Sequence, residues 1–142
     1  MLPAQLALLA LYDYPDPDFR GLHDVPDVAE LDVVGSTVLR DLSGLALWPI
    51  SRLQLDDCPG AVVTWHDLRQ VTGLEEVTIS RVATVDLTAL TADERSPVIR
   101  LRDCGEILIG PFTNLSRTVI DPGSQPRLVV DHTGGGASGQ QG

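Results

Sequence analysis

The stretch Ile50-Ser-Arg-Leu53-Gln-Leu55-Asp-Asp-Cys58 (ISRLQLDDC) contains a pattern that the rest of the chain repeats. It has the form apolar-x-x-apolar-x-apolar-x-x-small. The pattern returns at residues 28–36 and 74–82, and at residues 99–104 without its first apolar position. A shortened copy, polar at one core position, spans residues 115–120. Such internal repetition bears on the fold before any other feature of the sequence does.

The copies follow one another at nearly constant spacing. Equivalent positions lie 22, 24, 22 and 19 residues apart, counted along Leu31, Leu53, Val77, Ile99 and Thr118. A regular period in the twenties is typical of solenoids. Because alternate residues of a strand face opposite sides, each copy predicts a short strand with one apolar face. One copy cannot bury that face alone, so we expect the strands to stack in parallel around a continuous aliphatic core.

The repeated pattern resembles the leucine-rich repeat, L-x-x-L-x-L-x-x-C/N, and residues 50–58 match it best. The resemblance covers residues 28–121, about two thirds of the chain. It implies an α/β solenoid, with short parallel strands stacked in about five leucine-rich-repeat-like coils and joined by short helical or irregular returns. In one of these returns Thr64 is placed to cap a single helical turn.

The sequence predicts three regions. Residues 1–27 form an N-terminal capping segment: a helix that has Pro3 in its first turn and ends near Leu11, followed by a stretch rich in proline and aspartate. Residues 28–132 form the leucine-rich-repeat-like solenoid, with a last strand at residues 127–131. Residues 133–142 form a glycine-rich tail that we expect to be disordered.

Composition and charge restrict the partners. The net charge is −10, from 20 acidic and 10 basic residues, and every basic residue is arginine. Nucleic acid and anionic membranes would be repelled, so we expect neither as a partner. The absence of lysine indicates a GC-rich, bacterial genome. The apolar residues 1–11 lack the basic segment of a secretory signal and are too short to span a membrane, so we expect a cytoplasmic protein.

No catalytic residue, metal site or cofactor is predicted. Cys58 and Cys104 occupy equivalent positions two coils apart, roughly 10 Å if strands stack at about 4.8 Å. A disulfide needs Cα atoms closer than about 7 Å, so the two thiols should stay separate. His23, His66 and His132 lie in different segments without metal-ligand spacing.

The outward side chains of the predicted strands contain the candidate binding residues. Stacking aligns them in three columns: Glu30, Arg52, Glu76, Val98 and Arg117; Asp32, Gln54, Thr78, Arg100 and Val119; Val34, Asp56, Ser80, Arg102 and Asp121. Arg100 and Arg102 form a basic spot in an acidic protein, suited to binding a carboxylate or phosphate. Arg52, Glu76 and Asp56 complete the predicted binding surface.

The function predicted from this resemblance is that of a non-catalytic module, which binds a protein partner or senses a ligand on its strand face. Arrays of this irregular type resemble the C-terminal sensor segments of bacterial NACHT-type signalling proteins. Two alternatives remain open: a small parallel β-helix enzyme acting on polysaccharide through Asp56, Asp57 and Asp103, or a structural assembly module. The sequence leaves the partner and the oligomeric state undetermined.

Overall fold

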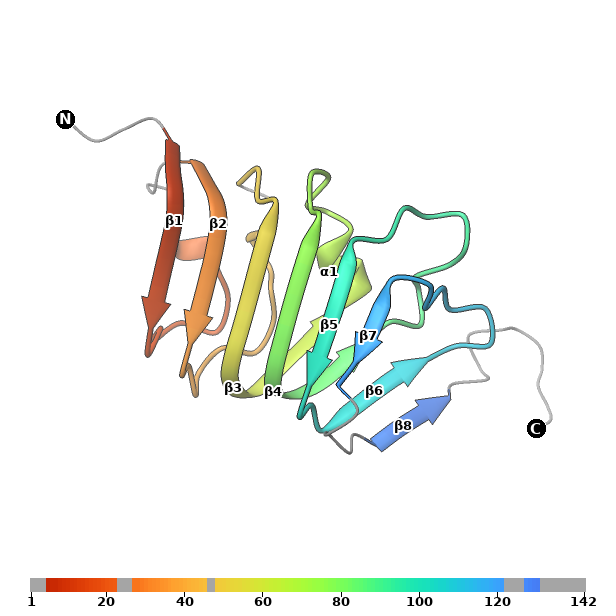
Figure 1. Cartoon of the computed structure of the whole chain (residues 1–142). Helices are drawn as coiled ribbons and strands as arrows, with labels where there is room; N and C mark the ends of the chain where they lie inside the picture. The colour runs from red at the N-terminus through yellow and green to blue at the C-terminus, as the bar shows by residue number, and fades with distance from the viewer. Residues whose placement is uncertain (1–4, 23–26, 46–47, 122–126, 131–142) are drawn as a thin grey trace.

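The chain winds into a parallel β-solenoid of about five turns, each of about 22 residues (Figure 1). The computed structural model describes residues 5–22, 27–45, 48–121 and 127–130. Its elements, in chain order, are β1 (Gln5–Tyr12), η1 (Arg20–Leu22), β2 (Asp27–Val34), β3 (Arg52–Thr64), α1 (Trp65–Leu68), β4 (Glu76–Asp86), β5 (Val98–Arg102), β6 (Glu106–Ile109), β7 (Thr118–Ile120) and β8 (Arg127–Val130).

The parallel sheet bends into two walls. The first wall runs β1-β2-β3-β4-β5-β7 and uses the N-terminal parts of β3 and β4. The second wall begins with the C-terminal parts of β3 and β4 and continues through β6 to β8. Figure 1 shows β6 and β8 turned away from the direction of the first wall. Each long strand therefore contributes to both walls of its coil.

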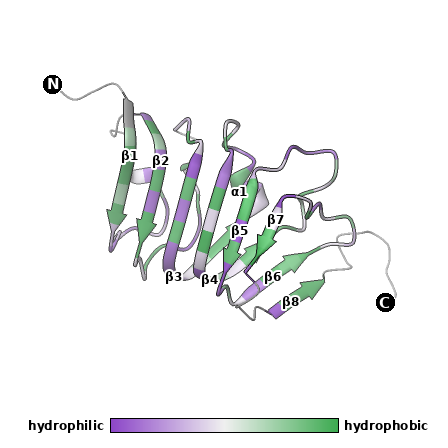
Figure 2. Cartoon of the chain, in the orientation of Figure 1, coloured by the Kyte–Doolittle hydropathy of each residue, from purple (hydrophilic) through white to green (hydrophobic). Residues whose placement is uncertain are grey.

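The strand register in the first wall confirms the predicted stacking. Leu53 aligns with Leu31 on one side and with Val77 on the other, and Val77 aligns with Ile99. All four side chains are buried. Figure 2 shows the resulting alternation of polar and apolar residues along β3 and β4. Since burying one such side chain stabilises a fold by about 1.5–3 kcal/mol, these columns supply much of the driving force for folding.

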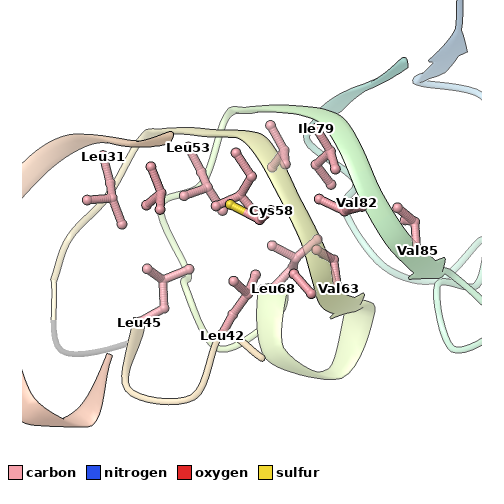
Figure 3. Close-up of a cluster of buried hydrophobic side chains, with 14 of the residues drawn as sticks. Leu31, Leu42, Leu45, Leu53, Cys58, Val63, Leu68, Ile79, Val82 and Val85 are labelled. Carbon is pink, nitrogen blue, oxygen red and sulfur yellow. The ribbon is translucent and has the colours of Figure 1, made fainter. Parts of the chain in front are cut away.

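Aliphatic residues from the returns close the core on its third side. In Figure 3, Leu42, Leu45 and Leu68 lie opposite the side chains of the first wall, such as Leu53 and Ile79. All of these side chains are buried. The core is thus a narrow column of branched aliphatic side chains, with few aromatic rings.

The α/β leucine-rich-repeat character expected from the pattern is not supported. Within the described residues the only α-helix is the single turn of α1, which Thr64 caps as predicted by accepting a hydrogen bond from the Asp67 N–H at 3.2 Å. The physical reason lies in the residues that follow each corner. Segments such as 61–64 and 106–109 are rich in valine and isoleucine, and they pair as second-wall strands instead of forming helices.

The N-terminal helix prediction is also wrong. Residues 5–12 form β1, which pairs in parallel with β2, and Leu9 and Leu11 pack against the core. Nearly every position of this segment is apolar, so its sequence fits a helix and a buried strand equally. Pairing with the exposed edge of β2 then favours the strand. The predicted last strand is confirmed as β8, whereas the predicted glycine-rich tail, residues 133–142, lies outside the described residues.

A column of left-handed residues forms the corner between the two walls. Asp13, Gly35, Asp57, Arg81 and Asp103 occupy equivalent places in successive coils, with φ values of 56°, 79°, 58°, 54° and 54°. This conformation disfavours most side chains by roughly 1–2 kcal/mol, although aspartate and glycine tolerate it better. The residue after each of the last four corners is buried: Ser36, Cys58, Val82 and Cys104. The small position of the sequence pattern is therefore the residue that enters the core directly after the corner.

The corner column predicts an asymmetric response at Asp57. Asp57→Val places a β-branched side chain in the left-handed region and should lower the free energy of unfolding by about 1–2 kcal/mol. Asp57→Gly should leave it unchanged or raise it by up to about 1 kcal/mol. Urea unfolding measures both. Gln54→Val is the matched control, because Gln54 is an exposed residue of the extended strand. Equal losses in Asp57→Val and Gln54→Val would contradict the explanation.

Candidate functional site

The five predicted binding residues lie on the outer face of the first wall. Arg52 aligns with Glu76, and Asp56 aligns through Ser80 with Arg102. Arg100 lies on β5 between Ile99 and Leu101, which are both buried. The alternation of each strand therefore sends these charged side chains outward while their neighbours anchor the backbone to the core. We call this surface the strand face.

Ion pairs cross the strand face from coil to coil. Glu76 lies between two arginines, with its Oε1 3.6 Å from Arg52 Nε and its Oε2 3.2 Å from Arg100 Nε. Three neighbouring strands are thus connected through one carboxylate. Each exposed pair of this kind contributes less than about 1 kcal/mol to stability, so these contacts orient the side chains more than they hold the fold.

A second group of charges gathers where the first-wall strands end. Arg102 Nε lies 3.6 Å from Asp103 Oδ2 and 3.4 Å from Asp121 Oδ2. Arg81 Nη2 donates a hydrogen bond of 2.8 Å to Asp56 Oδ1. This bond, together with the negative charge of Asp56, raises the pKa of Arg81 above its ordinary value. The corner residue Arg81 is therefore fixed beside the strand face.

These residues surround a depression of about 570 Å³. Its lining is Gln54, Asp56, Thr78, Ser80, Arg81, Arg100, Leu101, Arg102, Asp103, Val119 and Asp121. We call it the main hollow. Of the five predicted residues it contains Asp56, Arg100 and Arg102. Three guanidinium groups and three carboxylates meet here, so the surface is polar and of mixed charge.

A smaller hollow of about 290 Å³ adjoins the main one, and the two share Gln54 and Thr78. Arg52 and Glu76 line the smaller hollow. Asp32 also lines it, and its Oδ1 atom is buried without a hydrogen-bond partner among the described residues. An unpaired buried carboxylate oxygen is costly, and an incoming N–H group or water would satisfy it.

Sequence reasoning missed Arg81 and did not select Asp32. Arg81 lies at a corner, where its position corresponds to Gly35, Asp57 and Asp103 in other coils. The only signal for Arg81 in the sequence is that it directly follows Ser80, which belongs to the third outward column. Asp32 was in the second column, but nothing in the sequence shows that one of its oxygens is covered.

Other predicted residues are not brought to the strand face. His66 is exposed on α1, and the neighbouring Asp67 carboxylate accepts a 3.3 Å hydrogen bond from the Leu42 N–H. His23 and His132 lie outside the described residues. In the part of the chain that the structure describes, no group of three or more His, Cys, Asp and Glu side chains is arranged to hold a metal ion.

The two cysteines are separate, as predicted. Cys58 and Cys104 are buried free thiols. Cys104 Sγ lies 3.7 Å from the carbonyl oxygen of Ile79, a weak hydrogen bond within the core. Burial disfavours the thiolate, which raises the pKa of both cysteines. They serve as small apolar residues of the corner.

The raised thiol pKa values predict a loss of stability in alkali. Folding raises the thiol pKa above its ordinary value of 9.0. This difference stabilises the folded state fully below pH 9.0, and the stabilisation is lost as the pH rises through the thiol pKa values of the folded state. Burial also raises the pKa of Tyr14 from its ordinary value of 10.0 to about 12, so the loss of stability continues to higher pH. The urea midpoint should therefore fall as the pH rises above about 9.

The double variant Cys58→Ala, Cys104→Ala should show a shallower fall of the urea midpoint over the same range. Tyr14→Phe should remove the part of the fall that remains at higher pH. If the slope is the same in the original chain and in both variants, the buried thiols and the phenol do not cause it.

No protein-family model, curated protein or solved structure matches this chain. No helix in the described ranges is long and apolar enough to cross a membrane. Inferences about function therefore depend on the geometry of the strand face.

Proposed function

We propose that the chain is a non-catalytic binding module, which recognises a segment of a partner protein on the strand face. The observation that carries the proposal is the main hollow, where Arg81, Arg100 and Arg102 lie among carboxylates on rigid strands. The surface is concave, polar and preformed, which suits recognition of a charged segment.

The arginines retain hydrogen-bonding capacity for a ligand. Arg100 meets Glu76 through Nε, and Arg102 meets both of its aspartates through Nε. The terminal nitrogens of each guanidinium are the donors that form two parallel bonds to a carboxylate. Arg100 and Arg102 are two residues apart on one strand, so their Cα atoms lie about 6.6 Å apart. Two acidic side chains at i and i+2 of an extended segment have the same spacing.

The acidic groups of the face complement this arrangement. The unpartnered Oδ1 of Asp32 lies in the smaller hollow, away from the cluster of arginines in the main hollow. A ligand that carries an amide or basic group beside its acidic residues would satisfy both hollows. We therefore propose as the ligand a mixed-charge peptide segment, which presents two carboxylates at i and i+2 to Arg100 and Arg102 and an amide or basic group to Asp32, in a cytoplasmic protein.

The polysaccharide-acting enzyme is the second candidate, and one observation favours it: Asp56 and Asp103 line the same hollow. Each is, however, engaged by an arginine, Asp56 by Arg81 at 2.8 Å and Asp103 by Arg102 at 3.6 Å. A carboxylate that acts as general acid or base must face the substrate, and here each ion pair already occupies a carboxylate oxygen. The binding module therefore stands first.

The finer assignment to leucine-rich-repeat sensor segments of NACHT-type proteins stays a prediction. It rests on the apolar pattern and on the absence of lysine. Short parallel strands with an outward polar face are compatible with that role, and the ligand-binding surface proposed above does not depend on it.

Peptide selection tests the proposal. The immobilised chain should enrich a random displayed peptide library for sequences with acidic residues at i and i+2 beside a basic or amide side chain. The double variant Arg100→Glu, Arg102→Glu should weaken binding of the selected peptides by at least about tenfold, the loss of roughly 1.4 kcal/mol of interaction. Arg40→Glu, Arg95→Glu makes the same change in net charge at exposed sites away from the hollows and should bind within about twofold. Unchanged binding by the first variant would exclude the strand face.

The enzymatic alternative predicts a different result. Incubation with an acidic polysaccharide would release reducing ends, and the double variant Asp56→Asn, Asp103→Asn would abolish that release while keeping the fold. Such turnover would replace the binding proposal.

A further inference from the structure

The two ends of the solenoid present open strand edges. Within the described residues, β1 pairs only with β2, β7 only with β5 and β8 only with β6. All of these pairings are parallel. The β1 strand of a second copy could therefore pair in parallel with the free edge of β7. An edge of unpaired N–H and C=O groups is a template for a further strand.

Within residues 5–12 the N-terminal edge lacks two common forms of protection. The β1 sequence QLALLALY contains no charge and no proline, the two devices that commonly block edge pairing. Leu8 and Tyr12 are 56% and 69% exposed. Figure 2 shows apolar residues along β1 and along β7 and β8 at the opposite end.

At the C-terminal end, the last described coil leaves an inward side chain half exposed. Leu128 continues the inward column formed by Val85 and Ile107. Those two side chains are 0% and 1% exposed, whereas Leu128 is 53% exposed. The difference arises because no coil among the described residues lies over Leu128.

The registers of the two ends are compatible. The column that runs from Leu9 through Leu31 reaches Thr118 at the far end. Adding β1 of a second copy in the same register would place its Leu9 over Thr118 and its Leu11 over Ile120. The inward columns would then continue from one molecule into the next, with Thr118 as the one polar member of the first column.

The charges of the second wall are complementary at the same junction. Glu106 aligns with Arg127 in the last coil. In the first coil the equivalent stretch is Pro17–Asp18, since Arg40 donates to the Pro17 carbonyl at 2.8 Å and Val62 to the Arg40 carbonyl at 2.8 Å. Stacking would bring Arg127 of one copy next to the exposed Asp16 of the following copy, whereas the Asp18 carboxylate is already bound by Arg20.

We propose that copies of this chain associate head to tail, the β1 end of one copy adding to the β7 and β8 end of the next. The contact joins two different surfaces, so it does not close on itself and would build open linear assemblies. Because each copy carries a net charge of −10, repulsion opposes assembly at low salt, and screening should promote it.

Sedimentation velocity of the complete chain tests this proposal. The mass should rise above the 15.3 kDa of one chain as protein concentration increases, and it should rise further on addition of sodium chloride. A mass of 15.3 kDa at every concentration and salt level would overturn the proposal.

Two variants block one end each. Asp13 donates its N–H to the carbonyl of Val34 in β2, and successive residues of a strand donate in opposite directions, so the N–H of Ala10, three residues earlier, points away from β2. Ala10→Pro therefore removes a donor of the open edge and leaves the pairing with β2 intact. Leu128→Lys places a charge at the exposed end of the core. Circular dichroism would verify that both variants keep their strand content.

The mixing pattern distinguishes head-to-tail contacts from the alternatives. Each variant alone should remain at 15.3 kDa, and an equimolar mixture should give a species of twice that mass and nothing larger. Self-association of Leu128→Lys alone would indicate that two N-terminal ends pair. Self-association of Ala10→Pro alone would indicate pairing of two C-terminal ends. Either result would contradict the proposal.

Discussion

Stacking of aliphatic side chains in register is the constraint on which this structure depends. Each inward residue of a coil must lie over its equivalent in the preceding coil, as Leu53 lies over Leu31 and under Val77. Because strand side chains alternate, a slip of one residue would turn every apolar side chain outward. The near-constant length of the coils follows from this, as does the column of left-handed corners that brings each strand to its second wall at the same point.

The same constraint determines the candidate site. The register of the buried residues also determines which side chains are neighbours on the strand face. Glu76 lies between Arg52 and Arg100 for this reason, and Asp56 and Arg102 lie on the same column. Charged side chains that ion pairs already orient are well suited to recognition, since little conformational entropy remains to be lost when a ligand binds.

The stacking of the first wall could be predicted from the sequence, whereas the second wall, the corners and β1 could not. Spacing and alternation were sufficient to align the outward columns and to keep Cys58 apart from Cys104. Residues 5–12 are apolar at almost every position, so their period could not distinguish a helix from the strand that they form. Arg81 escaped notice because the corner is defined by its backbone conformation, which residues as different as glycine, aspartate and arginine adopt in this chain.

The short strands of the last coil have a consequence for how the molecule opens. β7 and β8 contain three and four residues, and the inward side chain of Leu128 is half exposed, whereas the inward aliphatic side chains of β3 and β4 are buried. In a solenoid each coil is held only by its neighbours, so local stability follows position along the axis. Backbone amides should therefore exchange with solvent fastest at the C-terminal coil and slowest around β3 and β4. Opening of the molecule would then resemble fraying from one end more than a single cooperative collapse.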